Sequence, residues 1–70
     1  MKGEYKQPRP GEVFYYLDSK LHYIGCAESE EDKVHVLWGW NEWKKRRYYE
    51  VYKDEVFKIF WSKFLTKTKL

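Results

Sequence analysis

Apolar and polar side chains alternate along the middle of the chain, which is the pattern of a β-strand. One side of this predicted strand carries Val34, Val36, Trp38 and Trp40, and the other carries His35, Leu37 and Gly39. The first set holds the larger apolar side chains. We therefore expect Val34, Val36 and Trp38 to face the core, and Trp40 to lie in the core or at its edge.

Three further segments have the composition of strands and are bounded by turn residues. Residues 12–17 are rich in aromatic and β-branched side chains, and Asp18-Ser19-Lys20 connects them to a second strand over residues 21–27. Gly25 within that strand predicts a bulge or a sharp bend. An acidic loop at 28–32 precedes the alternating strand, and a connection at 41–45 leads to a fourth strand at 46–52.

The C-terminal part of the chain has a helical apolar pattern. Its stripe consists of Val56, Phe57, Phe60, Trp61, Phe64 and Leu65. A strand, with Phe57, Ile59 and Trp61 on one side, explains fewer positions, although Ile59 is a misfit in the helix. The pattern predicts a helix from about 54 to 65 with Asp54 as its N-cap, with room for a short fifth strand before it.

Size and aromatic content limit how the chain can fold. Seventy residues suffice for one domain, and we expect residues 1–11 to form a flexible arm and residues 12–70 to form the domain. Four Trp, seven Tyr and four Phe make up 21% of the chain. A domain this small cannot enclose so many rings, so several should be exposed.

The polar side chains do not indicate an enzyme. No nucleophile lies beside a base, and one Cys with two His is too few for a closed zinc site. We therefore expect no catalysis, no cofactor and no small-molecule substrate. Cys26 should be a small buried hydrophobe in a reducing compartment. The chain has neither a signal-peptide pattern nor an apolar run of membrane-spanning length, which predicts a cytoplasmic protein without a membrane partner.

Charge is distributed unevenly and points to a binding site. Residues 1–43 hold five basic and eight acidic side chains, whereas residues 44–70 hold nine basic and three acidic ones. The densest cluster is Lys44, Lys45, Arg46 and Arg47, with Trp43 before it and Tyr48 after it. Basic side chains neutralise phosphates and neighbouring rings stack on unpaired bases. These residues predict a nucleic-acid-binding module, although a basic connection can also serve solubility alone.

Exposed aromatics suggest a second kind of partner. Trp40 and Trp43 bracket the connection between the third and fourth strands, where large rings are costly to expose without a purpose, and we expect Trp43 to be the exposed one of the two. A protein partner, or a cage of rings around a cation, would explain them. The alternative function is therefore a protein-interaction module, such as a peptide reader or a small inhibitor of a larger protein.

Several short motifs resemble a known class of small barrel. The stretch from Val34 to Asn41, which ends in Gly39-Trp40-Asn41, is followed by Tyr49-Glu50-Val51 and Asp54-Glu55-Val56. This order is similar to the second half of Tudor and chromo-barrel domains, over about residues 11–60. The resemblance implies a mainly β, SH3-like fold: a curled antiparallel sheet of four to five strands with a C-terminal helix across one opening. Such domains commonly bind methylated lysine or arginine, and some relatives bind nucleic acid.

Overall fold

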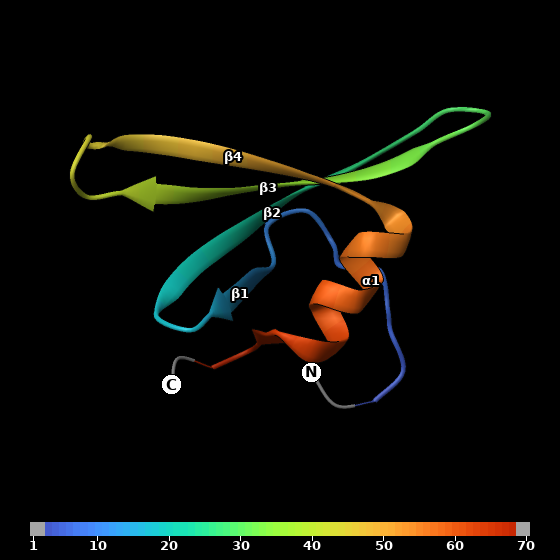
Figure 1. The fold of residues 1–70 in the computed structure, drawn as a ribbon, viewed down its shortest axis with the longest axis horizontal. Helices are drawn as coiled ribbons and strands as arrows, with labels where there is room; N and C mark the ends of the chain where they lie inside the picture. The colour runs from blue at the N-terminus through green and yellow to red at the C-terminus, as the bar shows by residue number, and fades with distance from the viewer. Residues whose placement is uncertain (1–2, 69–70) are drawn as a thin grey trace.

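Five strands form one antiparallel sheet, and a single helix covers part of one face (Figure 1). The computed structural model describes residues 3–68. In chain order, the elements are β1 (Val13–Tyr16), β2 (Ser19–Glu28), β3 (Lys33–Asn41), β4 (Arg46–Lys53), α1 (Asp54–Lys63) and β5 (Leu65–Thr66). The strand order across the sheet is β4-β3-β2-β1-β5. A small, mainly β domain with a C-terminal helix is thus confirmed.

The sheet is open rather than barrel-shaped. Over residues 3–68, β4 and β5 are its two edges and are not paired with each other. The β3–β4 and β2–β3 turns project to opposite ends of the molecule, at the left and right of Figure 1. The predicted bulge is confirmed, because the pairing of β2 with β3 shifts register between Tyr23 and Gly25. The first hairpin is tighter than expected: β2 begins at Ser19, which pairs directly with Tyr16.

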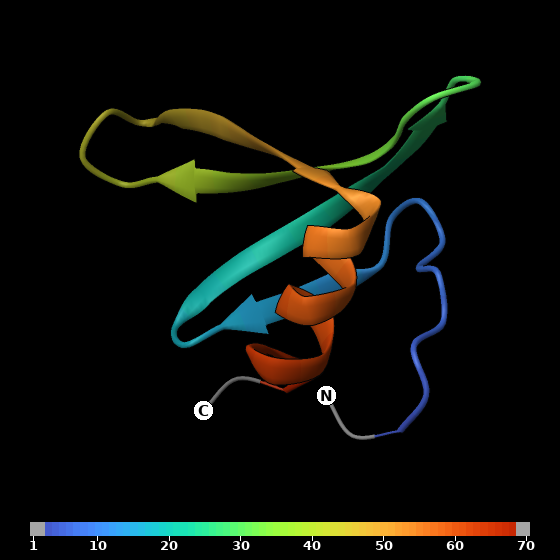
Figure 2. The ribbon, with the colours of Figure 1, turned by 45° about the vertical axis from the view of Figure 1, so that its right-hand side comes forward.

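The core lies between α1 and the face of the sheet that it covers, which we call the inner face (Figure 2). Its buried side chains are Phe14, Leu21, Tyr23, Leu37, Phe57, Trp61 and Leu65. Only Phe57 and Trp61 come from the helix, one turn apart on a single side. Each fully buried side chain of this size contributes roughly 1.5–3 kcal/mol, so α1 is an essential part of this small core.

The expected orientation of β3 is wrong. His35, Leu37 and Gly39 face the core, whereas Val34, Val36 and Trp38 are only half-buried on the opposite face, and Trp40 is 49% exposed. The reason is tertiary, because α1 packs on the side of His35, with the Phe57 ring stacked on it at 4.4 Å between centroids. Alternation separates two sets of side chains but does not tell which set the helix will cover.

The ends of the helix also differ from the prediction. α1 ends at Lys63, and the fifth strand follows the helix instead of preceding it. Val56 and Phe64, two members of the predicted stripe, are about half-exposed, as is Ile59. The N-cap position is Lys53, without a side-chain cap. Asp54 begins the helix itself, and its carboxylate accepts a hydrogen bond from His35 instead of capping the backbone.

Residues 3–11 form neither helix nor strand, as expected, but they pack on the domain. Tyr5 meets the ring of Trp61 edge-to-face at 5.3 Å between centroids, and Pro8 is buried. Met1, Lys2, Lys69 and Leu70, which belong to the predicted arm and domain, lie outside the described residues. Cys26 is exposed rather than buried, and its Sγ accepts a hydrogen bond from Gln7 at 3.2 Å.

Candidate nucleic-acid interface

The β3–β4 turn presents an ordered backbone and an exposed tryptophan. The Oδ1 atom of Asn41 accepts hydrogen bonds from the backbone N–H groups of Trp43 and Lys44, each at 3.0 Å. This side-chain turn fixes the tip, and Lys45 adopts a left-handed φ of 52° just before β4 begins. The Trp43 side chain is 96% exposed. It was predicted to be the exposed tryptophan of the connection, and this is confirmed.

The four predicted cations lie in this turn and at the start of β4, and all of them are exposed. Lys44 and Lys45 lie in the turn, where Lys45 forms an ion pair with Glu42 at 3.2 Å. Arg46 and Arg47 are the first residues of β4 and pair with Asn41 and Trp40 of β3. Because side chains alternate along a strand, Arg47 reaches the face of the sheet opposite to the core, and Arg46 the inner one.

Arg47 is held in a stack of planar groups on the outer face of the sheet, the face opposite to α1. Its guanidinium carbon lies 4.1 Å from the centroid of the Trp38 ring. The His22 imidazole, on the neighbouring strand β2, is parallel to the same ring with centroids 3.8 Å apart. Cation–π attraction and stacking therefore restrict the Arg47 side chain, so it loses less entropy when it binds an anion.

Trp40 and Tyr49 share this outer face and remain accessible, with exposed fractions of 49% and 60%. In the register of β3 and β4, Trp40 pairs with Arg47 and Trp38 pairs with Tyr49. The structure therefore brings Trp40, Arg47 and Tyr49 together beside the turn that carries Trp43.

The outer face has no acidic side chain among its strand residues. By pairing and alternation, the strands place there Val13, Tyr15, Lys20, His22, Gly25, Ala27, Val34, Val36, Trp38, Trp40, Arg47, Tyr49, Val51, Lys53 and Thr66. Among these strand residues, Lys20, Arg47 and Lys53 carry positive charge, which attracts anions. The acids Asp18 and Glu42 lie in the flanking turns, where they line a hollow together with Lys20 and Trp40.

Tyr48, which was also predicted to be a binding residue, projects to the other face of β4. It pairs with Gly39 on the inner face, and its ring fills the space that a Cβ atom at Gly39 would occupy. Burial raises the pKa of the Tyr48 hydroxyl, with a smaller effect from Glu50. Sequence reasoning missed Trp38, Tyr49 and His22 as surface residues. The alternation of β3 does put Trp38 and Trp40 on one face, but that face was expected to be the core face.

Burial and two cations lower the pKa of His22. Desolvation is the largest cause, and the positive charges of Lys20 and Arg47 add to it. The imidazole is therefore neutral at pH 7. Its neutral ring stacks on Trp38 without adding a third positive charge to this part of the face.

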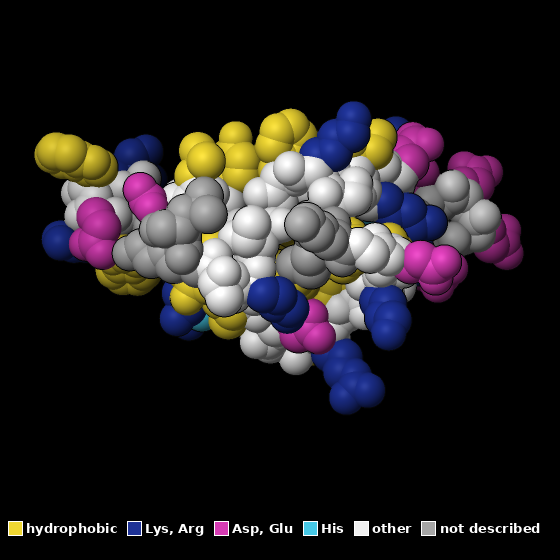
Figure 3. All heavy atoms as spheres, turned by 90° about the horizontal axis from the view of Figure 1, so that it is seen from below, with side chains coloured by type: hydrophobic (Ala, Val, Ile, Leu, Met, Phe, Trp, Pro, Cys, Tyr) yellow, Lys and Arg dark blue, Asp and Glu magenta, His cyan; other side chains and the backbone are white. Residues whose placement is uncertain are grey.

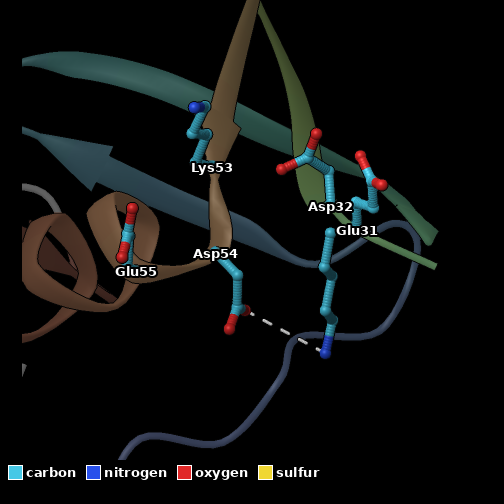
Figure 4. Close-up of a pocket in the computed structure, with 6 residues that line it drawn as sticks. Glu31, Asp32, Lys53, Asp54 and Glu55 are labelled. Atoms are coloured by element: carbon cyan, nitrogen blue, oxygen red, sulfur yellow. Dashed lines mark ion pairs between the residues drawn. The ribbon is translucent and has the colours of Figure 1, made fainter. Parts of the chain in front are cut away.

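The opposite end of the molecule is acidic. Acidic side chains gather at the right-hand end of Figure 3, over the β2–β3 loop, where Glu28, Glu30, Glu31 and Asp32 lie. A hollow of about 310 Å³ lies between this loop and the start of α1, lined by Glu31, Asp32, Lys33, Lys53, Asp54 and Glu55 (Figure 4). Within residues 3–68, no three His, Cys, Asp or Glu side chains converge as metal ligands would.

A buried hydrogen-bond chain lies behind this hollow. His35 is fully buried, with its Nδ1 atom 2.7 Å from the Tyr23 hydroxyl and its Nε2 atom 2.7 Å from Asp54. An ionised carboxylate only accepts hydrogen bonds, so the Nε2–H group of His35 donates to Asp54, and the Nδ1 atom accepts a hydrogen bond from the Tyr23 hydroxyl. The hydrogen bond from His35 lowers the pKa of Asp54, and Lys58 adds to this effect. Both ring nitrogens are thus satisfied by the fold, which gives this histidine a structural role.

Comparison with protein-family models, with curated proteins and with solved structures finds no match to this chain. The resemblance to Tudor and chromo-barrel domains therefore stays a prediction. Within the described part of the chain, α1 is the only helix, and it is too short and too polar to cross a membrane.

Proposed function

We propose that this protein is a non-enzymatic nucleic-acid-binding module that uses the β3–β4 turn. The observation that carries the proposal is Trp43, 96% exposed and followed directly by four exposed cations. The Trp43 indole is in water in the folded chain as in the unfolded one, so it contributes little to stability and its apolar surface is left for a partner. A base stacks on such a ring while the cations neutralise the adjoining phosphates.

The distribution of charge supports the same proposal. β3 connects the acidic β2–β3 loop to the basic β3–β4 turn, and its nine residues separate the two by about 30 Å. A polyanion is repelled from one end of the molecule and attracted to the other, so it approaches the turn in a preferred orientation.

The test is a titration with DNA or RNA at several salt concentrations. Four phosphate contacts from residues 44–47 give a log–log slope of affinity against salt of about −3 to −4. Replacing Lys44, Lys45, Arg46 and Arg47 together by Ala should flatten the slope and remove most binding. The matched control replaces Lys6, Arg9, Lys63 and Lys67, which lie elsewhere on the surface, and so loses the same charge. No binding by the parent protein at about 50 mM salt contradicts the proposal.

A protein-interaction module, either a peptide reader or a small inhibitor, is the second candidate. Val51 and Ile24 favour it, because they are 62% and 43% exposed, apolar, and offer nothing to a phosphate. Capture from lysate with and without nuclease separates the two functions. A partner protein that stays bound after nuclease treatment, and is lost with Val51→Asp but not with the four Ala substitutions, supports the second candidate.

A further inference from the structure

We infer that the nucleic acid is single-stranded, and that it extends from the turn across the outer face, where its bases stack on Trp40 and Tyr49. The inference rests on the proposed function and specifies the ligand and its path. It concerns a part of the surface that the basic turn alone does not explain.

The two rings are placed to serve neighbouring bases. Trp40 pairs with Arg47, and Tyr49 lies two residues further along β4. Trp40 and Tyr49 are therefore diagonal neighbours across the two strands, about 7–8 Å apart. This is roughly twice the 3.4 Å rise of one strand of a duplex. Adjacent rings on this face therefore leave room for a base between them, provided that the base is not already stacked on its own neighbours.

Arg47 lies where the backbone of such a strand would pass. It pairs across the sheet with Trp40, and its guanidinium is held over Trp38 rather than free in solution. The Trp38 ring is already in contact with Arg47 and His22, so it orients the cation and leaves stacking to the two accessible rings. A ring on either side of an immobilised cation matches a strand of alternating bases and phosphates.

Charge and ring exposure together select this ligand over others. The strand residues of the outer face include cations but no carboxylate, which matches a polyanion. A duplex offers phosphates, but its base faces are covered by stacking, and only the base edges are accessible in the grooves. Half-exposed rings on an open sheet gain little from base edges. They gain from the uncovered faces of unpaired bases.

The experiment compares two probes on the full chain at about 50 mM salt. One is a fluorescein-labelled oligothymidine of about 12 nucleotides, and the other is a DNA hairpin duplex with the same number of phosphates. We expect the single strand to bind at least about tenfold more tightly. Trp40→Leu and Tyr49→Leu should each weaken it by about tenfold, while Trp40→Phe, which keeps a stacking ring, stays within a factor of about three. Phe64→Leu is the matched control, because Phe64 is a ring of similar exposure, 53%, carried by the helix side.

The outcomes separate this inference from the proposed function. Equal affinity for both probes, with Trp40→Leu unchanged and the four Ala substitutions in the turn still disruptive, overturns the single-strand inference and leaves nucleic-acid binding intact. Weakening by Trp40→Phe equal to that by Trp40→Leu also overturns it, because the ring is then not used for stacking. Binding of neither probe overturns the proposed function itself.

Discussion

Asp54→Ala tests whether the buried His35 chain holds the helix to the sheet. The Asp54 carboxylate accepts a hydrogen bond from His35 at 2.7 Å and pairs with Lys58 at 3.1 Å. Without it, the Nε2–H group of His35, which is fully buried in the parent protein, loses its only described acceptor. The substitution therefore removes a charge-assisted hydrogen bond and also leaves a buried donor unsatisfied.

The expected loss of stability follows from these contacts. A hydrogen bond to a charged group is worth about 1.5–3 kcal/mol, and an i,i+4 ion pair such as that with Lys58 adds about 0.3–0.5 kcal/mol. The sum, about 2–3.5 kcal/mol, is a large share of the roughly 3.5–10 kcal/mol expected for a chain of this length. At about 4–8 °C per kcal/mol, the Tm should fall by roughly 8–28 °C.

Glu55→Ala is the matched control, and chemical and thermal denaturation followed by circular dichroism are the assays. Glu55 is exposed in the same first turn of α1, so it shares the helix-dipole contribution of about 0.3–1 kcal/mol but does not contact His35. The pKa of Asp54 is lowered in the folded state, so its stabilisation is complete above its ordinary value of 3.8 and is lost as the pH falls through the folded pKa. The difference between Asp54→Ala and the parent protein should shrink over that acidic range. Equal losses for Asp54→Ala and Glu55→Ala at pH 7 would refute the reasoning.

Three further predictions concern the surface, the inner face and pH. Trp43→Ala should change the free energy of unfolding by less than about 0.5 kcal/mol, because its side chain is 96% exposed, yet it should weaken oligothymidine binding about tenfold; denaturation and titration of the same variant measure both. Gly39→Ala should cost about 1–3 kcal/mol of stability by displacing the Tyr48 ring, and Gly39→Ala combined with Tyr48→Leu should recover part of that loss in denaturation experiments. The pKa of His22 is lowered from 6.5 in the folded state, so its contribution to stability is present above pH 6.5 and is lost as the pH falls through the folded pKa. The protonated, positively charged imidazole that forms over this range should also tighten oligothymidine binding. His22→Gln should remove both pH effects, and an unchanged pH profile would contradict this assignment.

Much of the fold could be predicted from local sequence patterns. The strands at 46–53 and 33–41, the bulge at Gly25 and the start of the helix at Asp54 follow from alternation, turn residues and helical periodicity. The predicted residues Trp43, Lys44, Lys45 and Arg47 also lie together at one end of the molecule. These features depend on neighbours in the sequence, which is the information that local patterns contain.

The errors concern contacts between distant residues. His35 and Asp54 are 19 positions apart, and their hydrogen bond joins the start of α1 to the face of β3 that the helix covers. Both faces of β3 carry apolar side chains, so hydrophobicity alone favoured the larger set, which includes Trp38. The packing of Tyr48 could not be predicted from local patterns either, because it depends on Gly39 across the sheet.

The reversed face changes what the aromatic content of the chain means. With one helix on an open sheet, only one face can be covered, and the inner face is filled by Phe57, Trp61 and their neighbours. The outer face then keeps Trp40 and Tyr49 accessible, at a cost relative to burial of about 25 cal/mol per Å² of apolar surface left in water. Arg47 and His22 reduce this cost at Trp38 by stacking on it, but the remaining rings have no such cover in the contacts described. A ligand that stacks on Trp40 and Tyr49 would cover their apolar surface, and its phosphates would supply an anion for Arg47. For this reason the turn and the outer face are best understood as one surface.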